Sequence, residues 1–174
     1  MQTSETSQAR FVELIEEHQG ILHRICSVYA DQAADRQDLF QDMVLQLWRS
    51  FASFRGQSSL TTWMYRVALN TALLERRKAS RRPDLSRGGE DEMKRVALDP
   101  PPLRDDLAVL RACIQELPSL DRAIVLLHLE ERNYDEIAEI TGLGRSNVSV
   151  RLVRLKERLR RALERKGLGK EARV

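Results

Sequence analysis

The chain has 174 residues and a net charge of +3, with 32% charged and 42% hydrophobic side chains. The apolar content excludes a wholly disordered chain, and the length suits one domain or two small ones. The sequence lacks both the run of about 18 apolar residues that a membrane span requires and, in residues 1–10, the apolar segment of a secretory signal. Two cysteines are too few for a disulfide framework. We therefore expect a soluble, cytoplasmic protein without membrane insertion.

The charges are unevenly distributed along the chain. Residues 49–82 carry 8 basic and 1 acidic side chains, and residues 142–174 carry 11 and 3, which gives +7 and +8. Residues 1–48 and 107–141 are acidic instead, at −5 and −4. Two basic blocks favour two surfaces for a polyanion, although a single charge run is more often only a solvated helix face.

Helical periodicity dominates residues 8–82. Apolar residues recur on one face from Phe11 to Val28, which predicts a first helix, and Asp35 is expected to cap a second one. The second helix carries two adjacent apolar stripes, so we expect one to be buried and the other to dock a partner. The first stripe is Leu39, Met43, Leu47 and Phe51, and the second is Phe40, Val44 and Trp48.

A loop at Gly56–Ser59 precedes the third expected helix, which starts near Leu60 or Thr61 and ends in a basic segment near Arg82. Basic side chains suit the C-terminus of a helix electrostatically. Trp63 in this helix is expected to pack in the core.

Residues 83–103 combine proline, glycine and acidic residues with almost no apolar periodicity. This composition predicts an acidic, semi-stiff but flexible linker. The linker divides an all-α chain into two small domains, residues 8–82 and 104–165, followed by a basic tail at 166–174.

The second domain is predicted to begin with a helix over 105–116, and Asp121 is expected to cap the next helix. The segment Asn133–Glu136 is like a capping box, with Asn in place of the usual Ser or Thr, and it opens a short helix over 134–140. A turn at 141–144 contains two glycines and leads into a long basic helix. This order is typical of a helix-turn-helix, for which an ordinary helical hairpin is the alternative.

The last helix has a face suited to DNA. Asn147 could pair with adenine, and Arg151 or Arg154 with guanine or phosphate. Val150 and Val153 face outward, where they could touch thymine methyl groups or pack on another protein or on the linker. The residues expected on the inward face are Val148, Leu152, Leu155 and Leu159.

No catalytic constellation, phosphate-binding loop or metal site emerges, so the sequence predicts neither an enzyme nor a cofactor. His23 and Cys26 are spaced to share a metal ion, but two ligands are too few for a structural zinc site. A core cysteine beside a polar histidine is the simpler interpretation.

The motifs of both domains resemble the extracytoplasmic-function sigma factors, group IV of the sigma-70 family. Residues Asp38–Arg49 are similar to their core-polymerase-binding helix, and Phe54–Asn70 to their promoter-melting and −10-recognition segment. Residues 117–163, with Tyr134-Asp-Glu-Ile-Ala138, resemble their −35-recognition domain. The motifs stand in the family's order over nearly the whole chain, which makes the resemblance specific.

The resemblance implies a sigma factor that binds bacterial core RNA polymerase at the β′ clamp helices and the β flap, and that directs promoter recognition, DNA melting and transcription initiation. Such a protein could also bind an anti-sigma factor or another regulatory partner. The residues that match the polymerase-binding surface are Asp38, Gln41, Asp42, Gln46 and Leu47. The −10 set is Arg55, Gly56, Gln57, Ser58, Ser59 and Asn70, with Arg66, Arg77 and Lys78 as candidates for phosphate contacts. The −35 set is Arg145, Ser146, Asn147, Ser149, Val150, Arg151 and Arg154.

The chain departs from the family where Ser149 stands in place of a frequent basic residue and Gly144 in place of a Ser or Thr cap. The strength or the sequence of the −35 contact could differ as a result. Judged from the sequence pattern without the family resemblance, a base contact and a polar position on the helix surface are equally compatible with Asn70.

Two other functions are compatible with a helix-turn-helix. A free-standing regulator that binds duplex DNA as a dimer would have no use for the melting segment at 54–70. An interaction adaptor that does not bind DNA would not need the two basic blocks.

Overall fold

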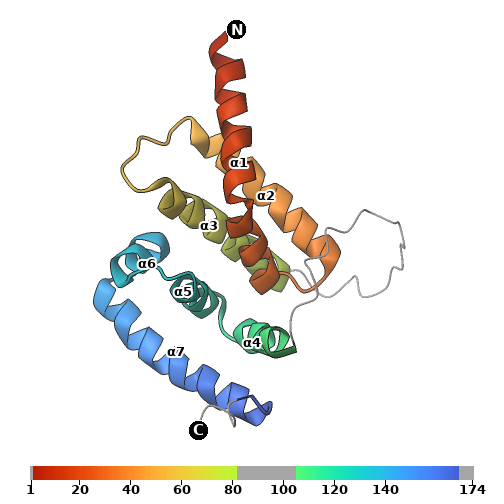
Figure 1. Ribbon diagram of the computed structural model, residues 1–174, viewed down its shortest axis with the longest axis vertical. Helices are drawn as coiled ribbons and strands as arrows, with labels where there is room; N and C mark the ends of the chain where they lie inside the picture. The colour runs from red at the N-terminus through yellow and green to blue at the C-terminus, as the bar shows by residue number, and fades with distance from the viewer. Residues whose placement is uncertain (1, 82–104, 169–174) are drawn as a thin grey trace.

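The computed structural model describes residues 2–81 and 105–168, and the regular structure in both ranges is entirely α-helical (Figure 1). This confirms the all-α fold class. The predicted linker at 83–103 and most of the predicted basic tail lie outside the described residues. The helices are α1 (Gln2–Tyr29), α2 (Ala33–Phe51), α3 (Leu60–Arg81), α4 (Asp105–Gln115), α5 (Ser119–Leu129), α6 (Tyr134–Thr141) and α7 (Arg145–Arg165).

Helices α1, α2 and α3 pack together as the first domain because each carries an apolar stripe at helical spacing. The first predicted stripe of α2 faces inward, with Leu39, Met43 and Leu47 buried. The predicted cap at Asp35 is wrong, because α2 begins at Ala33 and Asp35 lies in its first turn. A carboxylate in the first turn still interacts favourably with the helix dipole.

Aromatic side chains hold α1 and α2 against the start of α3. The ring centroid of Phe11 lies 5.0 Å from that of Trp48 and 5.4 Å from that of Phe51. The centroid of Trp63 lies 5.0 Å from that of Phe54, and its side chain is 8% exposed, which confirms its expected place in the core. The aromatic cluster therefore supports both ends of the loop between α2 and α3.

In the second domain, α5 lies between α4, α6 and α7, and residues 122–127 are all buried. The predicted cap at Asp121 is wrong: Pro118 is the N-cap residue of α5, and Asp121 instead accepts a hydrogen bond from Arg151 on α7. Asp121 thus links α5 to α7, whereas the sequence pattern indicated only that it would begin α5.

The helix-turn-helix is formed by α6 and α7, and its predicted capping box is confirmed. The Asn133 side chain accepts hydrogen bonds from the backbone N–H groups of Asp135 and Glu136, at 3.0 and 2.9 Å. The carboxylate of Glu136 accepts one from the backbone N–H of Asn133 at 2.9 Å. Gly142 ends α6 with φ of 73°, a left-handed conformation that favours glycine, and Gly144 precedes α7.

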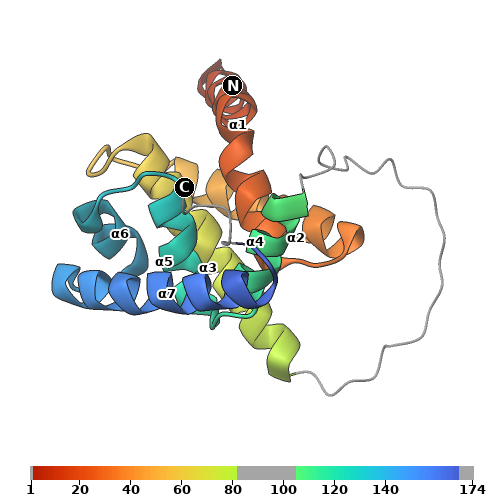
Figure 2. The same ribbon diagram turned by 60° about the horizontal axis from the view of Figure 1, so that its bottom comes forward.

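The two domains pack against each other, an arrangement that the sequence did not predict. Helices α4 and α5 contact α1, and α5 and α6 contact α3, so the second domain lies along one side of the first (Figures 1 and 2). Buried apolar residues of both domains form one continuous cluster. Among the helices of the two described ranges, none is both long and apolar enough to cross a membrane.

Candidate nucleic-acid and protein interfaces

The face of α7 that points away from the domain core combines polar, basic and apolar side chains. Val148, Leu152 and Leu155 are buried, as predicted, and Leu159 is half-buried; the helix packs on α4, α5 and α6. On the other side, Val150 and Val153 are 52% and 66% exposed. Exposed valines are unusual on a solvated helix, and in a DNA major groove the apolar contact available to them is the thymine methyl group.

Asn147 and Arg151 form one hydrogen-bonded unit at the start of α7. Arg151 Nε donates to the side-chain oxygen of Asn147 at 2.9 Å, and Arg151 Nη1 lies 2.9 Å from Asp121 Oδ1. The guanidinium therefore holds the Asn147 amide in one orientation and ties α7 to α5. Arg145 pairs with Asp135 at 3.3 Å on the exposed side of the turn. Because Arg145 and Arg151 both have acidic partners, the structure fixes where their two positive charges lie.

Beyond the first turns, α7 continues as a basic helix. One open hollow is lined by Arg154, Glu157, Arg158, Arg161, Glu164 and Arg165. Glu157 accepts hydrogen bonds from Arg160 and Arg161, which lower the pKa of its carboxyl to about 2. Ser146 and Arg154 are exposed and Ser149 is half-buried, so these predicted −35 residues lie on or beside the outer face.

The loop between α2 and α3 carries the first part of the predicted −10 set. Arg55, Gly56 and Gln57 are exposed, Ser58 is half-buried, and Gly56 has φ of 70°. The hydroxyl of Ser59 accepts a hydrogen bond from the N–H of Thr62 at 3.1 Å. Ser59 thus caps the start of α3, a structural role that competes with its predicted contact to DNA.

The remainder of the predicted −10 set lies along α3. Asn70 is exposed, as is the basic end of the helix with Arg77 and Lys78. Lys78 pairs with Glu75 one turn earlier at 2.6 Å. Arg66 is different, because its guanidinium lies 2.6 Å from the carboxylate of Glu139 on α6, in the other domain.

The outer face of α2 is the candidate protein-docking surface. Asp38, Gln41, Asp42 and Gln46 are exposed, as a docking role requires. Leu47 is fully buried, so its assignment to that surface is wrong: it lies on the inward stripe, where it packs in the core. Leu45 and Trp48, which the prediction omitted from the set, are 44% and 41% exposed. The sequence pattern could have identified Trp48, because it lies on the second apolar stripe of α2, which was expected to dock a partner.

Within the described ranges, no group of three or more His, Cys, Asp and Glu side chains could hold a metal ion. Cys26 is buried in the first domain, where desolvation raises the pKa of its thiol to about 12. His23 stacks on Phe40, with ring centroids 4.8 Å apart. The cysteine and histidine therefore have the structural roles that the simpler interpretation gave them.

Comparison with known proteins finds matches to two segments of the chain, which correspond to the two helical domains. A family model described as Sigma-70 region 2 matches residues 14–82, and one described as Sigma-70, region 4 matches residues 107–164. The chain is 32% identical to the ECF RNA polymerase sigma-E factor of Haemophilus influenzae over 146 residues, which cover 75% of each protein. It is 30% identical to the RNA polymerase sigma-H factor of Pseudomonas aeruginosa over 148 residues, 78% of this chain and 77% of the relative.

A solved structure shares the fold across both domains. It is the sigma factor RpoE in complex with the anti-sigma factor NepR from Bartonella quintana. The similarity has a TM-score of 0.69 at 19% sequence identity, and it covers 89% of this chain and 97% of the solved one.

Proposed function

Because this chain belongs to the sigma-70 family and is a sigma factor of the extracytoplasmic-function type, we propose that its two domains recognise the two promoter elements separately. As an RNA polymerase sigma factor it directs transcription initiation, and its partners are core RNA polymerase and promoter DNA. It is not an enzyme, since catalysis belongs to the polymerase. In our proposal the first domain recognises the −10 element and the second the −35 element.

The outer face of α7 carries the −35 part of the proposal. A recognition helix contacts base edges mainly through its N-terminal residues, and here those residues are held in place by the Arg151 contacts to Asn147 and Asp121. Asn147 would pair with adenine and Arg154 with guanine or phosphate, while Val150 would contact thymine methyl groups. The accompanying residues on this face are Arg145, Ser146, Ser149 and Arg151.

The −10 part rests on a loop with a rigid support. A base taken out of the duplex needs a pocket that is already formed, and the aromatic contacts of Phe54 with Trp63 hold the loop at the start of α3. Arg55, Gly56, Gln57 and Ser58 would surround such a base. Further residues in this part of the proposal are Ser59, Arg66, Asn70, Arg77 and Lys78.

For the polymerase, we propose that the exposed α2 residues Asp38, Gln41, Asp42 and Gln46 dock on the β′ clamp helices, and that the second domain meets the β flap. Leu45 and Trp48 add apolar area to the α2 surface, which an acidic face alone would lack. We also infer that the protein works in the cytoplasm, where the polymerase is. An anti-sigma factor is a further proposed partner, since the similar RpoE was captured with one.

The two alanine variants Asn70→Ala and Arg154→Ala separate the two modules. Asn70→Ala should impair formation of the open complex and alter the −10 preference, while the −35 preference stays unchanged. Arg154→Ala should alter the −35 preference and leave the −10 preference unchanged. If Arg154 contacts a base, the loss should be on the order of 1–3 kcal/mol at one −35 position; if it contacts phosphate, the loss should be uniform across sequences.

Permanganate footprinting on a promoter that is artificially open across the −10 region supplies the measurement. Opening should not rescue Arg154→Ala, because its defect precedes melting. It should partly rescue Asn70→Ala if that residue helps to open the duplex. If Asn70→Ala leaves both opening and −10 preference untouched, Asn70 is only a polar residue on the surface of α3.

A further inference from the structure

Three side chains connect α5 to the start of the helix that we assign to the −35 element. Arg151 on α7 donates from Nε to the side-chain oxygen of Asn147, one turn earlier on the same helix, at 2.9 Å. Its Nη1 donates to a carboxylate oxygen of Asp121, in the first turn of α5, also at 2.9 Å. Arg151 therefore lies between a residue that we assign to DNA and a residue of another helix.

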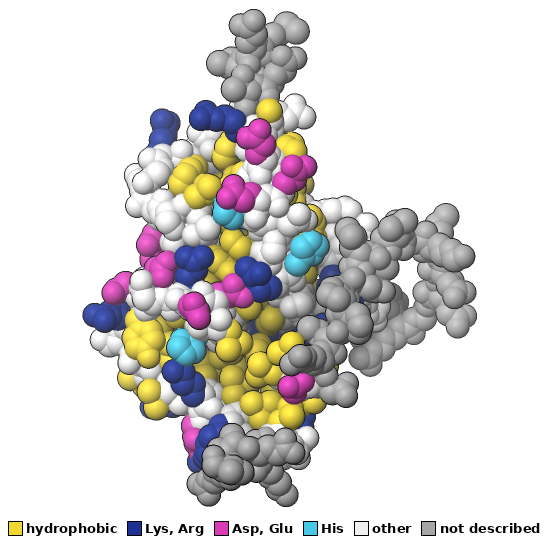
Figure 3. All heavy atoms as spheres, viewed as in Figure 1, with side chains coloured by type: hydrophobic (Ala, Val, Ile, Leu, Met, Phe, Trp, Pro, Cys, Tyr) yellow, Lys and Arg dark blue, Asp and Glu magenta, His cyan; other side chains and the backbone are white. Residues whose placement is uncertain are grey.

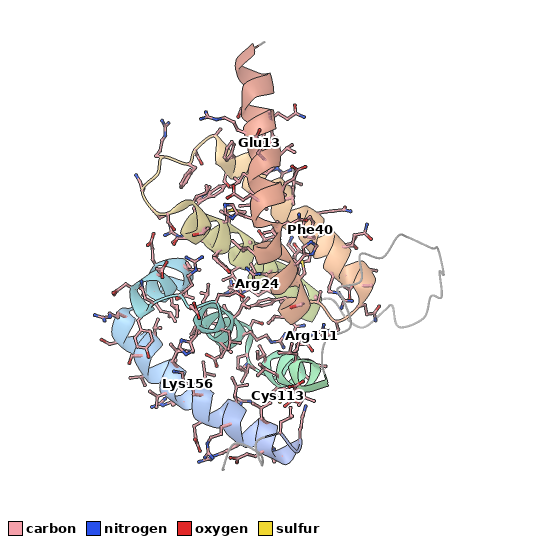
Figure 4. All side chains as sticks on the ribbon, viewed as in Figure 1. Glu13, Arg24, Phe40, Arg111, Cys113 and Lys156 are labelled. Atoms are coloured by element: carbon pink, nitrogen blue, oxygen red, sulfur yellow. The ribbon has the colours of Figure 1, made fainter. Side chains whose placement is uncertain are left out.

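Helix α5 gives the carboxylate of Asp121 a rigid support. Residues 122–127 are all buried, and α5 packs on α7. Figure 4 shows side chains of α5 reaching toward α7, the helix that carries the labelled Lys156. The side chain of Asp121 is 16% exposed and that of Arg151 is 39% exposed. The more buried carboxylate thus holds the guanidinium in place from the core side of the helix.

The two hydrogen bonds engage both donor edges of the Arg151 guanidinium. A bidentate contact uses two neighbouring nitrogens on one edge, either Nε with Nη2 or Nη1 with Nη2. Because Nε donates to Asn147 and Nη1 to Asp121, each edge has one nitrogen that is already used within the protein. A paired contact with O6 and N7 of guanine would therefore compete with a bond that Arg151 already makes.

The same guanidinium determines which way the amide of Asn147 points. A guanidinium can only donate, so it holds the amide oxygen and not the amide nitrogen. A carbonyl oxygen has two lone pairs, and Oδ1 can therefore accept a second hydrogen bond from a base while Nδ2 donates one. An acceptor and a donor in this order match adenine, whose N6 donates and whose N7 accepts.

Loss of the Arg151 contact would remove this order. The last side-chain torsion of asparagine is broad and roughly two-fold, so an unheld amide can turn by about 180° and exchange its oxygen and nitrogen. A turned amide presents a donor where adenine N6 also donates. It then suits a base that offers an acceptor at that place, such as O4 of thymine or O6 of guanine.

We propose that Asp121 and Arg151 are positioning residues that set the −35 specificity through Asn147, and that Arg151 itself contacts no base. The inference rests on the proposed function in one respect, the assignment of Asn147 to a base of the −35 element. It adds a specificity determinant on α5, outside the recognition helix. It also leaves the exposed Arg154 as the arginine that contacts guanine or phosphate.

Run-off transcription on templates randomised across the −35 element measures the base preference at each position. The full-length chain is used together with core polymerase. Asn147→Ala should weaken the preference for adenine at one position on the order of tenfold. Asp121→Ala should weaken the preference at the same position by a similar factor, although Asp121 lies on another helix. The double variant should be no weaker than either single one, because the side chains act as one unit.

Two substitutions of Arg151 separate positioning from a direct contact with DNA. Lysine keeps the charge but lacks the planar fork that reaches Asn147 and Asp121 at once, so Arg151→Lys should relax the adenine preference as Asp121→Ala does. Arg151→Ala should relax it too, with the salt dependence of promoter binding unchanged. A phosphate contact would instead keep the preference and flatten the salt slope by about one unit.

Asp135→Ala is the matched control. Asp135 also pairs with an arginine at the start of α7, since it lies 3.3 Å from Arg145, but Asn147 takes no part in that pair. This variant should keep the adenine preference of the parent chain. Circular dichroism checks that each variant is folded. Should Asp121→Ala fail to fold, the two Arg151 variants provide the same comparison.

The proposal is overturned if Asn147→Ala relaxes one −35 position while Asp121→Ala and Arg151→Lys keep the preference of the parent chain there. That result would leave the proposed function intact. A lost preference for guanine at a second position in Arg151→Ala would also overturn it, because Arg151 would then contact a base itself. If Asn147→Ala changes no −35 position, the assignment of Asn147 in the proposed function is wrong, and the positioning role is refuted with it.

Discussion

Replacing Asn133 by alanine should destabilise the second domain by about 1 kcal/mol, the typical cost of losing a helix N-cap. The structure shows what is lost: one side-chain oxygen accepts hydrogen bonds of 3.0 and 2.9 Å from the N–H groups of Asp135 and Glu136 in the first turn of α6. Asn133 is exposed, so water can reach the released N–H groups, and the cost should stay well below that of a buried unpaired donor.

For a chain of this size, about 1 kcal/mol corresponds to a fall in Tm of roughly 2–4 °C. Thermal unfolding followed by circular dichroism measures it. Asn133→Ser keeps an acceptor at the cap and should retain most of the stability, and Asn133→Gly should lose only a few tenths of a kcal/mol relative to the parent chain. If Asn133→Ala melts at the parent temperature while its helical content is unchanged, the capping box contributes nothing to stability and the reasoning fails.

The remaining predictions concern pH, polymerase binding and salt. The hydrogen bond from the Asn133 N–H, and after it the Arg132 guanidinium, hold the pKa of the Glu136 carboxyl below its usual 4.5. The ionised carboxylate therefore contributes its full stabilisation above pH 4.5, and this contribution is lost as the pH falls through the lowered pKa. Acid-unfolding curves of Glu136→Gln should lack this loss. Charge reversal at Asp38 and Asp42 should weaken binding to core polymerase in a titration without changing helical content; unaltered affinity would refute the docking surface. Neutralising Arg77 and Lys78 should flatten the salt dependence of promoter binding by the holoenzyme by about one unit of slope per lost phosphate contact. An unchanged slope would place those two side chains off the DNA.

Much of the fold could be predicted from local patterns. The α6 capping box and the inward stripe of α7 follow from spacing alone, because helix ends and apolar faces depend on neighbouring residues. The caps at Asp35 and Asp121 failed for the same local reason. An acidic residue suits a first turn as well as an N-cap, and only the structure shows that Asp121 is held by Arg151 on another helix.

The contact between the domains had no sequence signal. Arg24, Arg66 and Glu139 look like ordinary solvated charges on their own helices, and their partners lie 73 to 106 residues away. A composition typical of a linker also favoured independent domains. The error at Leu47 has another cause. The resemblance to the family assigned Leu47 to the polymerase-binding surface, although its position four residues after Met43 on the first apolar stripe already indicated the core.

The apolar surface that remains exposed also could not be predicted in detail. Figure 3 shows hydrophobic side chains gathered over α4, α5 and α7 on one face of the molecule. Which apolar residues of an amphipathic helix stay exposed depends on how the helices pack, and packing joins residues distant in sequence.

Run-off transcription with core RNA polymerase on a library of randomised promoters tests the central claim most directly. We expect transcripts only when this chain is added, from templates enriched for one −10 and one −35 sequence at a fixed spacing. Arg154→Ala should relax the enrichment at the −35 element alone, and Asn70→Ala at the −10 element alone. A chain that leaves core polymerase inactive on every template, or that binds duplex templates without the polymerase and yields no transcript, would contradict the account.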